Sequence, residues 1–174
     1  MREIVVGGLG CATAVRIVDG SSTLAPVVER AWRRCLARTT ELPRSETVAF
    51  SLDGDALTAE DGDIRAVAKQ LDVGLQTLTQ QVTRAKIRFQ AGRMLMLHAG
   101  AVCHPTTREA IAFVAPGGTG KTTLTTLLSS AYSYLTDETV GVDRNGQVFP
   151  YPKPLSLRRL DESAKSEMSP DDLG

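Results

Sequence analysis

An apolar run, a glycine-rich loop and a helical stripe follow one another in the second half of this 174-residue chain. The run covers residues 110–115 and has the length and residue types of a buried strand. After the loop, apolar residues recur at helical spacing at Leu124, Leu127, Leu128 and Ala131. A strand that passes through a tight loop into a helix predicts an α/β fold, and no other feature of the chain constrains the fold as strongly.

The loop has the composition of a phosphate-binding loop. Residues 115–123 read Ala-Pro-Gly-Gly-Thr-Gly-Lys-Thr-Thr and depart from G-x-x-x-x-G-K-[ST] only at Ala115, which replaces the first glycine. In such a loop the backbone N–H groups surround a polyphosphate, the lysine reaches the outer phosphates and the hydroxyl binds Mg²⁺. A glycine-rich solvent loop is the alternative, and the flanking strand and helix argue against it. The expected nucleotide-binding residues are Gly117, Gly118, Thr119, Gly120, Lys121, Thr122 and Thr123.

Two carboxylates, Asp137 and Glu138, follow the next apolar segment. Phosphoryl transfer needs Mg²⁺ to neutralise the phosphates and a carboxylate to hold that metal or to take the proton of the acceptor hydroxyl. We therefore predict Lys121, Asp137 and Glu138 as catalytic residues, and Thr122, Asp137 and Glu138 as metal ligands. A pair of turn carboxylates is the alternative. Only 16 positions separate Lys121 from Asp137, which leaves room for one helix and one strand and favours a compact kinase over large ATPase motors.

Composition limits the partners. Basic and acidic residues number 20 each, and the apolar fraction of 42% is sufficient for a core. This balance predicts no general attraction to nucleic acid or to a membrane, and no apolar run of about 18 residues occurs. The three cysteines form no C-x-x-C pair, so neither a disulfide framework nor a zinc site is indicated, and we expect a reducing cytoplasm.

Two regions are predicted, a small α+β region at residues 1–93 and a nucleotide-binding core at residues 94–174. In the first region, residues 3–6 and 13–18 are expected to form a hairpin, and amphipathic helices are expected from Leu24 and from Asp63. The core is expected to begin with a strand at 94–102. Asn145-Gly146 predicts a hairpin, and the acidic stretch from Asp161 predicts a frayed tail or the start of a further segment.

Three segments, taken in order and spacing, resemble the HPr serine kinase family. They are residues 97–102 (Leu-His-Ala-Gly-Ala-Val), the loop at 117–124 and residues 135–138 (Leu-Thr-Asp-Glu). The loop is also similar to the nucleotide loop of phosphoenolpyruvate carboxykinases, whose nucleotide-binding fold HPr kinases share. Some family members, including kinases associated with lasso-peptide gene clusters, have an additional α/β region before the kinase core, to which residues 1–93 would correspond.

The resemblance implies an α/β fold with a P-loop, mixed-sheet core of the phosphoenolpyruvate carboxykinase and HPr kinase type. It also implies an ATP- and Mg²⁺-dependent kinase that phosphorylates a hydroxyl, serine in this family, on a small protein or peptide. Lys121 would contact the β- and γ-phosphates, Thr122 would bind Mg²⁺, and Asp137 would act as general base or metal ligand. Glu138 stands where the family usually has a second Asp.

Three further residues are candidates for contacts with substrate or phosphate. His98 matches a family histidine upstream of the loop, and a strand histidine satisfied by the backbone is the alternative. Lys153 and Arg158 have the charge to bind a phosphorylated group or an acidic substrate, and solvated basic side chains are the alternative.

The family's kinase core continues well beyond the length seen here, so the core is expected to be C-terminally incomplete. Two other functions remain open. One is a nucleotide-binding regulatory or assembly module without catalysis. The other is a small-molecule kinase of the shikimate or nucleoside type, although those chains generally begin with the phosphate loop, and more than a hundred residues precede it here. The acceptor and the oligomeric state, a homo-oligomer included, are left open.

Overall fold

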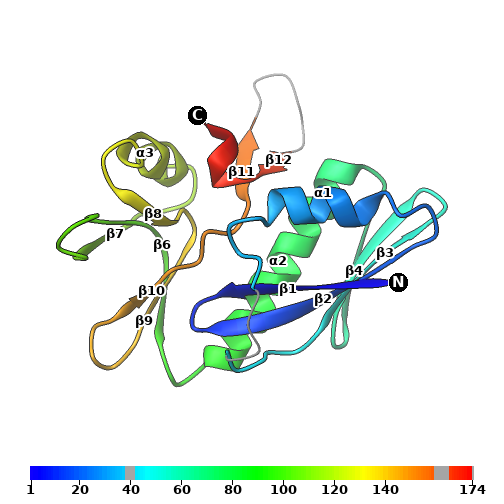
Figure 1. Ribbon diagram of the computed structural model, residues 1–174, viewed down its shortest axis with the longest axis horizontal. Helices are drawn as coiled ribbons and strands as arrows, with labels where there is room; N and C mark the ends of the chain where they lie inside the picture. The colour runs from blue at the N-terminus through cyan, green and yellow to red at the C-terminus, as the bar shows by residue number, and fades with distance from the viewer. Residues whose placement is uncertain (38–41, 159–164, 174) are drawn as a thin grey trace.

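The chain is described by a computed structural model that covers residues 1–37, 42–158 and 165–173 (Figure 1). These residues form a mixed α/β structure, as the sequence predicts. The first half contains β1 (Arg2–Gly8), β2 (Cys11–Asp19), α1 (Leu24–Ala31), β3 (Val48–Asp53), β4 (Ala56–Asp61), β5 (Ile64–Ala68) and α2 (Leu71–Gln90). The second half contains β6 (Leu95–Cys103), β7 (Ala110–Val114), α3 (Lys121–Leu128), β8 (Ser133–Thr136), β9 (Thr139–Val142), β10 (Val148–Phe149), β11 (Leu155–Arg158), β12 (Lys165–Met168) and a 3₁₀ turn (Pro170–Leu173).

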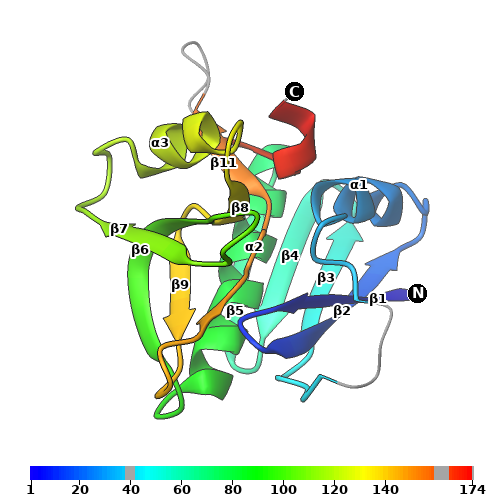
Figure 2. The same ribbon diagram turned by 60° about the vertical axis from the view of Figure 1, so that its left-hand side comes forward.

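The first sheet has the order β1-β2-β3-β4-β5. Its neighbours are antiparallel except for β2 and β3, which are parallel because α1 lies between them in the chain. The predicted hairpin of β1 and β2 is confirmed. The long helix α2 runs through the middle of the molecule, between this sheet and the strands of the second half (Figures 1 and 2). It covers the first sheet and closes a core in which Val6, Val15, Phe50, Leu78 and Val82 are fully buried.

The helix predicted from Asp63 is wrong over its first residues. Residues 64–68 form strand β5, which pairs with β4 through a turn in which Gly62 has a φ of +59°. Apolar residues at 64, 67, 68 and 71 match helical spacing by coincidence, because β5 is an edge strand and leaves Ile64 and Val67 exposed. The helix begins at Leu71 and continues through Gly74. A Cβ on Gly74 would lie 2.8 Å from Leu57 Cδ1, so glycine lets α2 pack closely on β4.

The second sheet is built around β6. It has the order β10-β9-β6-β7, and β8 pairs with the end of β6 beside the β9 pairing. All of these pairs are antiparallel, whereas a mixed sheet was expected here. The predicted hairpin at Asn145-Gly146 is confirmed by the pairing of β9 with β10.

The apolar strand before the glycine loop was predicted to be buried, but it is largely exposed. Within the described residues β7 pairs with β6 alone, and Ile111 and Val114 are 55% and 64% exposed. Helix α3 packs on β6 and β8 rather than over β7. This packing depends on Gly100 of β6, since a Cβ there would lie 2.6 Å from the Thr125 hydroxyl of α3 and would also clash with the Phe113 ring.

The end of the chain returns to the first half. Tyr151 belongs to the first core, and its hydroxyl lies 2.9 Å from Thr83 Oγ1 of α2. Strand β12 lies against α2, and Asp171 forms an ion pair with Arg33 at 2.8 Å. The prediction of a frayed acidic tail is therefore wrong for residues 165–173, while residues 161–164 lie outside the described part of the chain. We call residues 150–158 and 165–173 the return segment, because they carry these contacts with the first half.

A buried lysine fastens the β1–β2 turn to α2. Lys86 Nζ donates hydrogen bonds to Val6 O at 2.9 Å and to Cys11 O at 3.2 Å. Burial lowers the pKa of Lys86 from its ordinary value of 10.5 to about 8, although the neighbouring Cys11 and Cys35 oppose this shift.

The lowered pKa of Lys86 predicts that stability rises with pH. Between pH 8 and 10.5 the unfolded chain binds more protons at this residue than the folded protein does, so the folded state gains stability as pH rises through this window. Between pH 7 and 9, we expect the free energy of unfolding of the wild type to rise by roughly 1 kcal/mol relative to that of Lys86→Met. Urea unfolding at the two pH values measures this difference. Equal pH dependence of the two proteins would contradict this assignment.

Candidate functional site

The glycine loop at residues 115–120 connects β7 to α3, so strand, loop and helix follow in the expected order. Gly118 and Gly120 have φ angles of +79° and +91°, and residues with a Cβ rarely adopt such angles. Thr119 Oγ1 donates a hydrogen bond to Pro116 O at 2.8 Å. Lys121 begins α3, and its Nζ donates to Ala115 O at 2.7 Å and to Pro116 O at 3.0 Å. The lysine ammonium is therefore held at the loop.

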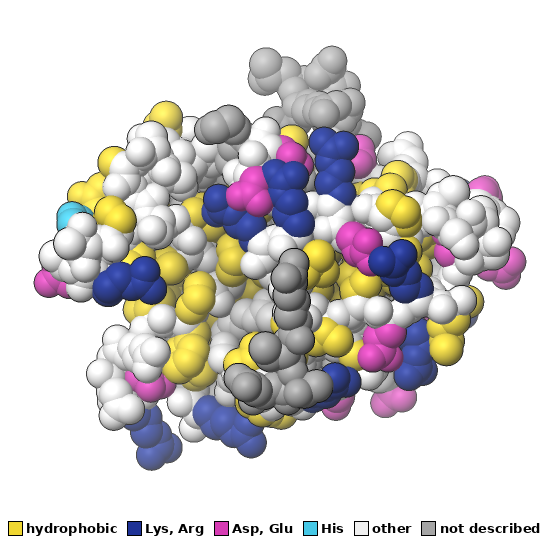
Figure 3. Space-filling model, in the orientation of Figure 1, with side chains coloured by type: hydrophobic (Ala, Val, Ile, Leu, Met, Phe, Trp, Pro, Cys, Tyr) yellow, Lys and Arg dark blue, Asp and Glu magenta, His cyan; other side chains and the backbone are white. Residues whose placement is uncertain are grey.

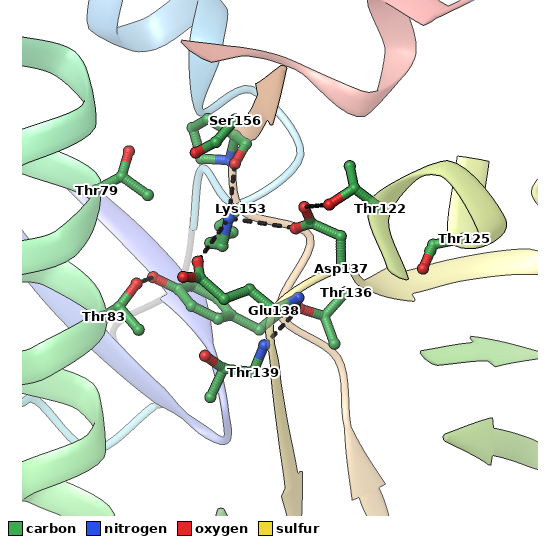
Figure 4. Close-up of polar contacts among 12 residues, drawn as sticks. Thr79, Thr83, Thr122, Thr125, Thr136, Asp137, Glu138, Thr139, Lys153 and Ser156 are labelled. Atoms are coloured by element: carbon green, nitrogen blue, oxygen red, sulfur yellow. Dashed lines mark hydrogen bonds and ion pairs between the residues drawn. The ribbon is translucent and has the colours of Figure 1, made fainter. Parts of the chain in front are cut away.

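The first helical turn of α3 meets the carboxylate of Asp137. Strand β8 runs antiparallel to β6 and delivers Asp137 beside the start of α3, where Thr122 Oγ1 donates to Asp137 Oδ2 at 3.0 Å (Figure 4). Tyr134 donates to the other carboxylate oxygen at 3.1 Å. Burial, and then the charge of Asp137, raises the pKa of Tyr134 well above its usual range, so the phenol remains a neutral donor. Both oxygens of this buried carboxylate thus have fixed partners.

Lys153 joins the two acidic residues. Its Nζ lies 3.2 Å from Asp137 Oδ1 and 3.0 Å from Glu138 Oε2, and it also donates to Pro154 O at 3.0 Å. Its side chain is 1% exposed, so the alternative of a solvated lysine is wrong. Burial alone would lower the pKa of Lys153, but the charges of Asp137 and Glu138 outweigh burial and raise it. The lysine therefore stays charged.

The two acidic residues have different surroundings. The Asp137 side chain is 4% exposed and points toward α3, whereas the Glu138 side chain is 43% exposed and has Lys153 as its ion-pair partner. The backbone of Glu138 is fixed, because its carbonyl accepts a hydrogen bond from Ala99 N at 3.0 Å. Asp137 thus faces the glycine loop, and Glu138 is the more accessible carboxylate.

A cavity of about 150 Å³ separates these carboxylates from helix α2, and we call it the α2 cavity. Behind it, the buried Glu167 accepts a hydrogen bond from Thr79 Oγ1 at 2.9 Å and another from Ser156. Burial raises the pKa of Glu167, and the charge of Lys153 partly offsets this effect. The cavity is lined by Gln76, Thr79 and Gln80 of α2 and by Asp137, Glu138, Lys153 and Ser156.

The lining residues from α2 were not predicted from the sequence. A signal was present, because Gln76, Thr79, Gln80 and Thr83 lie at helical spacing and form a polar stripe beside the apolar stripe of the helix. Such a stripe is normally solvated, and only the contacts of Tyr151 and of β12 with α2 show that this one faces other protein groups. Tyr134 was missed as well, since no local pattern distinguishes it.

The other predicted site residues are not seen to join this cluster in the described part of the structure. His98 is exposed on β6, opposite Thr139, and does not line the α2 cavity. Arg158 ends β11, and its side chain is outside what the structure describes. Gly117 is exposed within the loop, and Thr123 is exposed on the first turn of α3. In the described ranges no group of three His, Cys, Asp or Glu residues converges, so the candidate metal ligands are two carboxylates and the hydroxyl of Thr122.

On the face drawn in Figure 3, basic and acidic side chains are intermixed rather than gathered by sign. None of the helices in the described ranges is both long and apolar enough to cross a bilayer.

Comparison with known proteins adds no assignment. The chain matches no family model, no curated protein and no solved structure.

Proposed function

We propose that this protein is a nucleotide- and Mg²⁺-dependent phosphotransferase of the HPr serine kinase type. The observation that carries the proposal is the 3.0 Å hydrogen bond from Thr122 Oγ1 to Asp137 Oδ2. It joins the lysine-threonine end of the glycine loop to the carboxylate that follows the next strand, which are the two parts that a magnesium-phosphate site requires. This contact is not expected if the loop is an ordinary solvent loop and Asp137 is an unrelated turn carboxylate.

The nucleotide phosphates would lie in the glycine loop. The positive φ angles of Gly118 and Gly120 and the start of α3 at Lys121 support this role, since a loop of this kind turns N–H groups inward at the positive end of a helix. Lys121 is positioned at the loop to exchange its contacts with Ala115 O and Pro116 O for phosphate oxygens. By its resemblance to the family, the core would be a P-loop fold of the phosphoenolpyruvate carboxykinase type.

The residues beside the loop fit a magnesium ion. Mg²⁺ prefers hard oxygen ligands and is usually held by one or two carboxylates, a hydroxyl, phosphates and water. Thr122 and Asp137 supply such oxygens within hydrogen-bond distance of each other, and Glu138 is adjacent. When bound, Mg²⁺ would neutralise charge on the phosphates. Tyr134 and Lys153 would keep the Asp137 carboxylate oriented for this role.

Glu138 is the better candidate for the general base. Its carboxylate is accessible and borders the α2 cavity, whereas both oxygens of Asp137 already have partners. An acceptor hydroxyl in the cavity would pass its proton to Glu138 as its oxygen attacks the terminal phosphorus, and the bond to the nucleoside diphosphate would break. The acceptor we propose is a hydroxyl, serine by family resemblance, on a small protein or peptide. We also propose a cytoplasmic setting, since all three cysteines are free and buried.

Transfer of labelled phosphate from ATP tests this function. We expect Mg²⁺-dependent release or transfer of the terminal phosphate by the wild type, and loss of it in both Lys121→Ala and Asp137→Asn. Lys69→Ala is the matched control, because Lys69 is an exposed lysine outside the site. Turnover that persists in Lys121→Ala would refute the proposal.

One observation favours a second function, a regulatory nucleotide-binding module without catalysis. The ammonium of Lys153 contacts both carboxylates that would hold the metal and accept the proton. If this contact is never released, nucleotide would bind without turnover. Saturable ATP binding with no release of phosphate would favour this module over the kinase.

A further inference from the structure

We propose that helix α2 forms one wall of the acceptor site, and that the α2 cavity receives the acceptor as one short, uncharged, hydroxyl-bearing side chain. Gln76 and Gln80 would orient that side chain against Glu138. This inference rests on the proposed function, and it adds a role for the first half of the chain that the loop and its carboxylates do not require.

The position of the cavity supports an acceptor role. Asp137 lies next to both the start of α3 and the cavity, because one of its oxygens accepts from Thr122 and the other faces Lys153, which lines the cavity (Figure 4). Glu138 borders the cavity and is exposed enough to be reached by a second substrate. A phosphate donor in the loop and a hydroxyl in the cavity would therefore both lie next to the Asp137–Glu138 pair.

The cavity wall consists of groups that bind a hydroxyl or an amide. Gln76 is half-buried and Gln80 is exposed, and each offers both a donor and an acceptor. Thr79 and Ser156 turn their hydroxyls toward Glu167 and form the inner end of the cavity. The return segment holds this wall in place by packing β12 on α2.

Charge and size restrict the acceptor. Asp137 and Glu138 contribute two negative charges against the single positive charge of Lys153, and Glu167 lies behind them, so an anionic acceptor would be repelled. A volume of about 150 Å³ holds a few water molecules or one short polar side chain. The rest of the acceptor would stay outside, near the exposed Gln80.

ATP is the co-reactant and supplies the transferred phosphoryl group. The acceptor oxygen forms a bond to the terminal phosphorus, the bond from that phosphorus to the bridging oxygen of ADP breaks, and the hydroxyl proton goes to Glu138. ADP leaves with the electron pair of the broken bond. No oxidant or reductant is needed.

The experiment uses the full chain with ATP, Mg²⁺ and two small probes, neutral N-acetylserine amide and anionic glycerate. We expect transfer to N-acetylserine amide and at least tenfold slower transfer to glycerate. Together, the substitutions Gln76→Leu and Gln80→Leu should raise the KM for N-acetylserine amide about tenfold. Each substitution removes hydrogen bonds to the acceptor.

Gln70→Leu is the control, since Gln70 is an exposed glutamine that precedes α2 and does not line the cavity. An unchanged KM in both cavity variants would overturn the inference, and so would equal use of glycerate. ATP hydrolysis without transfer to either probe would also overturn it, while leaving the nucleotide site intact. Failure of the wild type to bind Mg²⁺-ATP would instead refute the proposed function itself.

Discussion

Replacing Lys153 with methionine is expected to lower the free energy of unfolding by about 3–5 kcal/mol. The Lys153 ammonium is the cation that lies between Asp137 and Glu138, and its side chain is 1% exposed. Methionine has a similar length but no charge, so the buried Asp137 would lose its counter-charge, and Glu138 and Glu167 would face it without compensation. Urea unfolding near neutral pH measures the effect.

The loss in free energy of unfolding in Lys153→Met distinguishes a buried ion pair that holds the site together from an exposed surface ion pair. Exposed ion pairs contribute about 0–1 kcal/mol. Lys69→Met, at an exposed position, is the matched control and should change stability by less than about 0.5 kcal/mol. A loss below about 1 kcal/mol in Lys153→Met would mean that the charges of this cluster are solvated and do not hold the site together.

Substituting Asp137 with asparagine is expected to reduce Mg²⁺-dependent phosphate release by about 10³-fold or more, equivalent to about 4 kcal/mol of transition-state stabilisation. Asparagine keeps the shape of the side chain but removes its negative charge. It also replaces one carboxylate oxygen with an amide nitrogen, either at the oxygen that accepts from Thr122 or at the oxygen that faces Tyr134 and Lys153. Steady-state release of phosphate at saturating ATP measures this loss. Binding of ATP without Mg²⁺ should change much less, since the glycine loop is untouched.

Asp55→Asn is the control for this substitution, because Asp55 is exposed in the β3–β4 turn. It should retain wild-type turnover. If Asp137→Asn keeps its rate within tenfold of wild type, Asp137 has no essential part in holding the metal, and the 3.0 Å contact with Thr122 has only a structural role.

The parts of the site that sequence reasoning found are local in the chain. The glycine loop and Asp137-Glu138 follow strands at short spacing, so composition and order are enough to place them. Lys153 could not be interpreted in the same way. Its burial arises because residues 150–158 cross back to the first half, as Pro150 O accepts from Leu9 N at 3.1 Å and Tyr151 enters the first core. No local pattern predicts such a long-range contact.

Two errors in the predicted fold have the same physical origin. Periodicity assigned residues 64–68 to a helix, but a glycine turn allows them to pair with β4 as an edge strand. The run at 110–114 was expected to be buried because it is apolar, yet exposure depends on neighbouring strands, and β7 has β6 as its partner in the described sheet. Apolar composition indicates that a segment can be buried, while topology decides whether it is.

The most direct test of the nucleotide site is a calorimetric titration of ATP into the wild type and Lys121→Ala, each with and without Mg²⁺, with Lys69→Ala as the lysine control. We expect saturable binding that is strengthened by Mg²⁺ in the wild type and in Lys69→Ala, and that is weakened at least tenfold in Lys121→Ala. Equal affinity of the wild type and Lys121→Ala, or no binding by the wild type, would contradict a nucleotide site at the glycine loop.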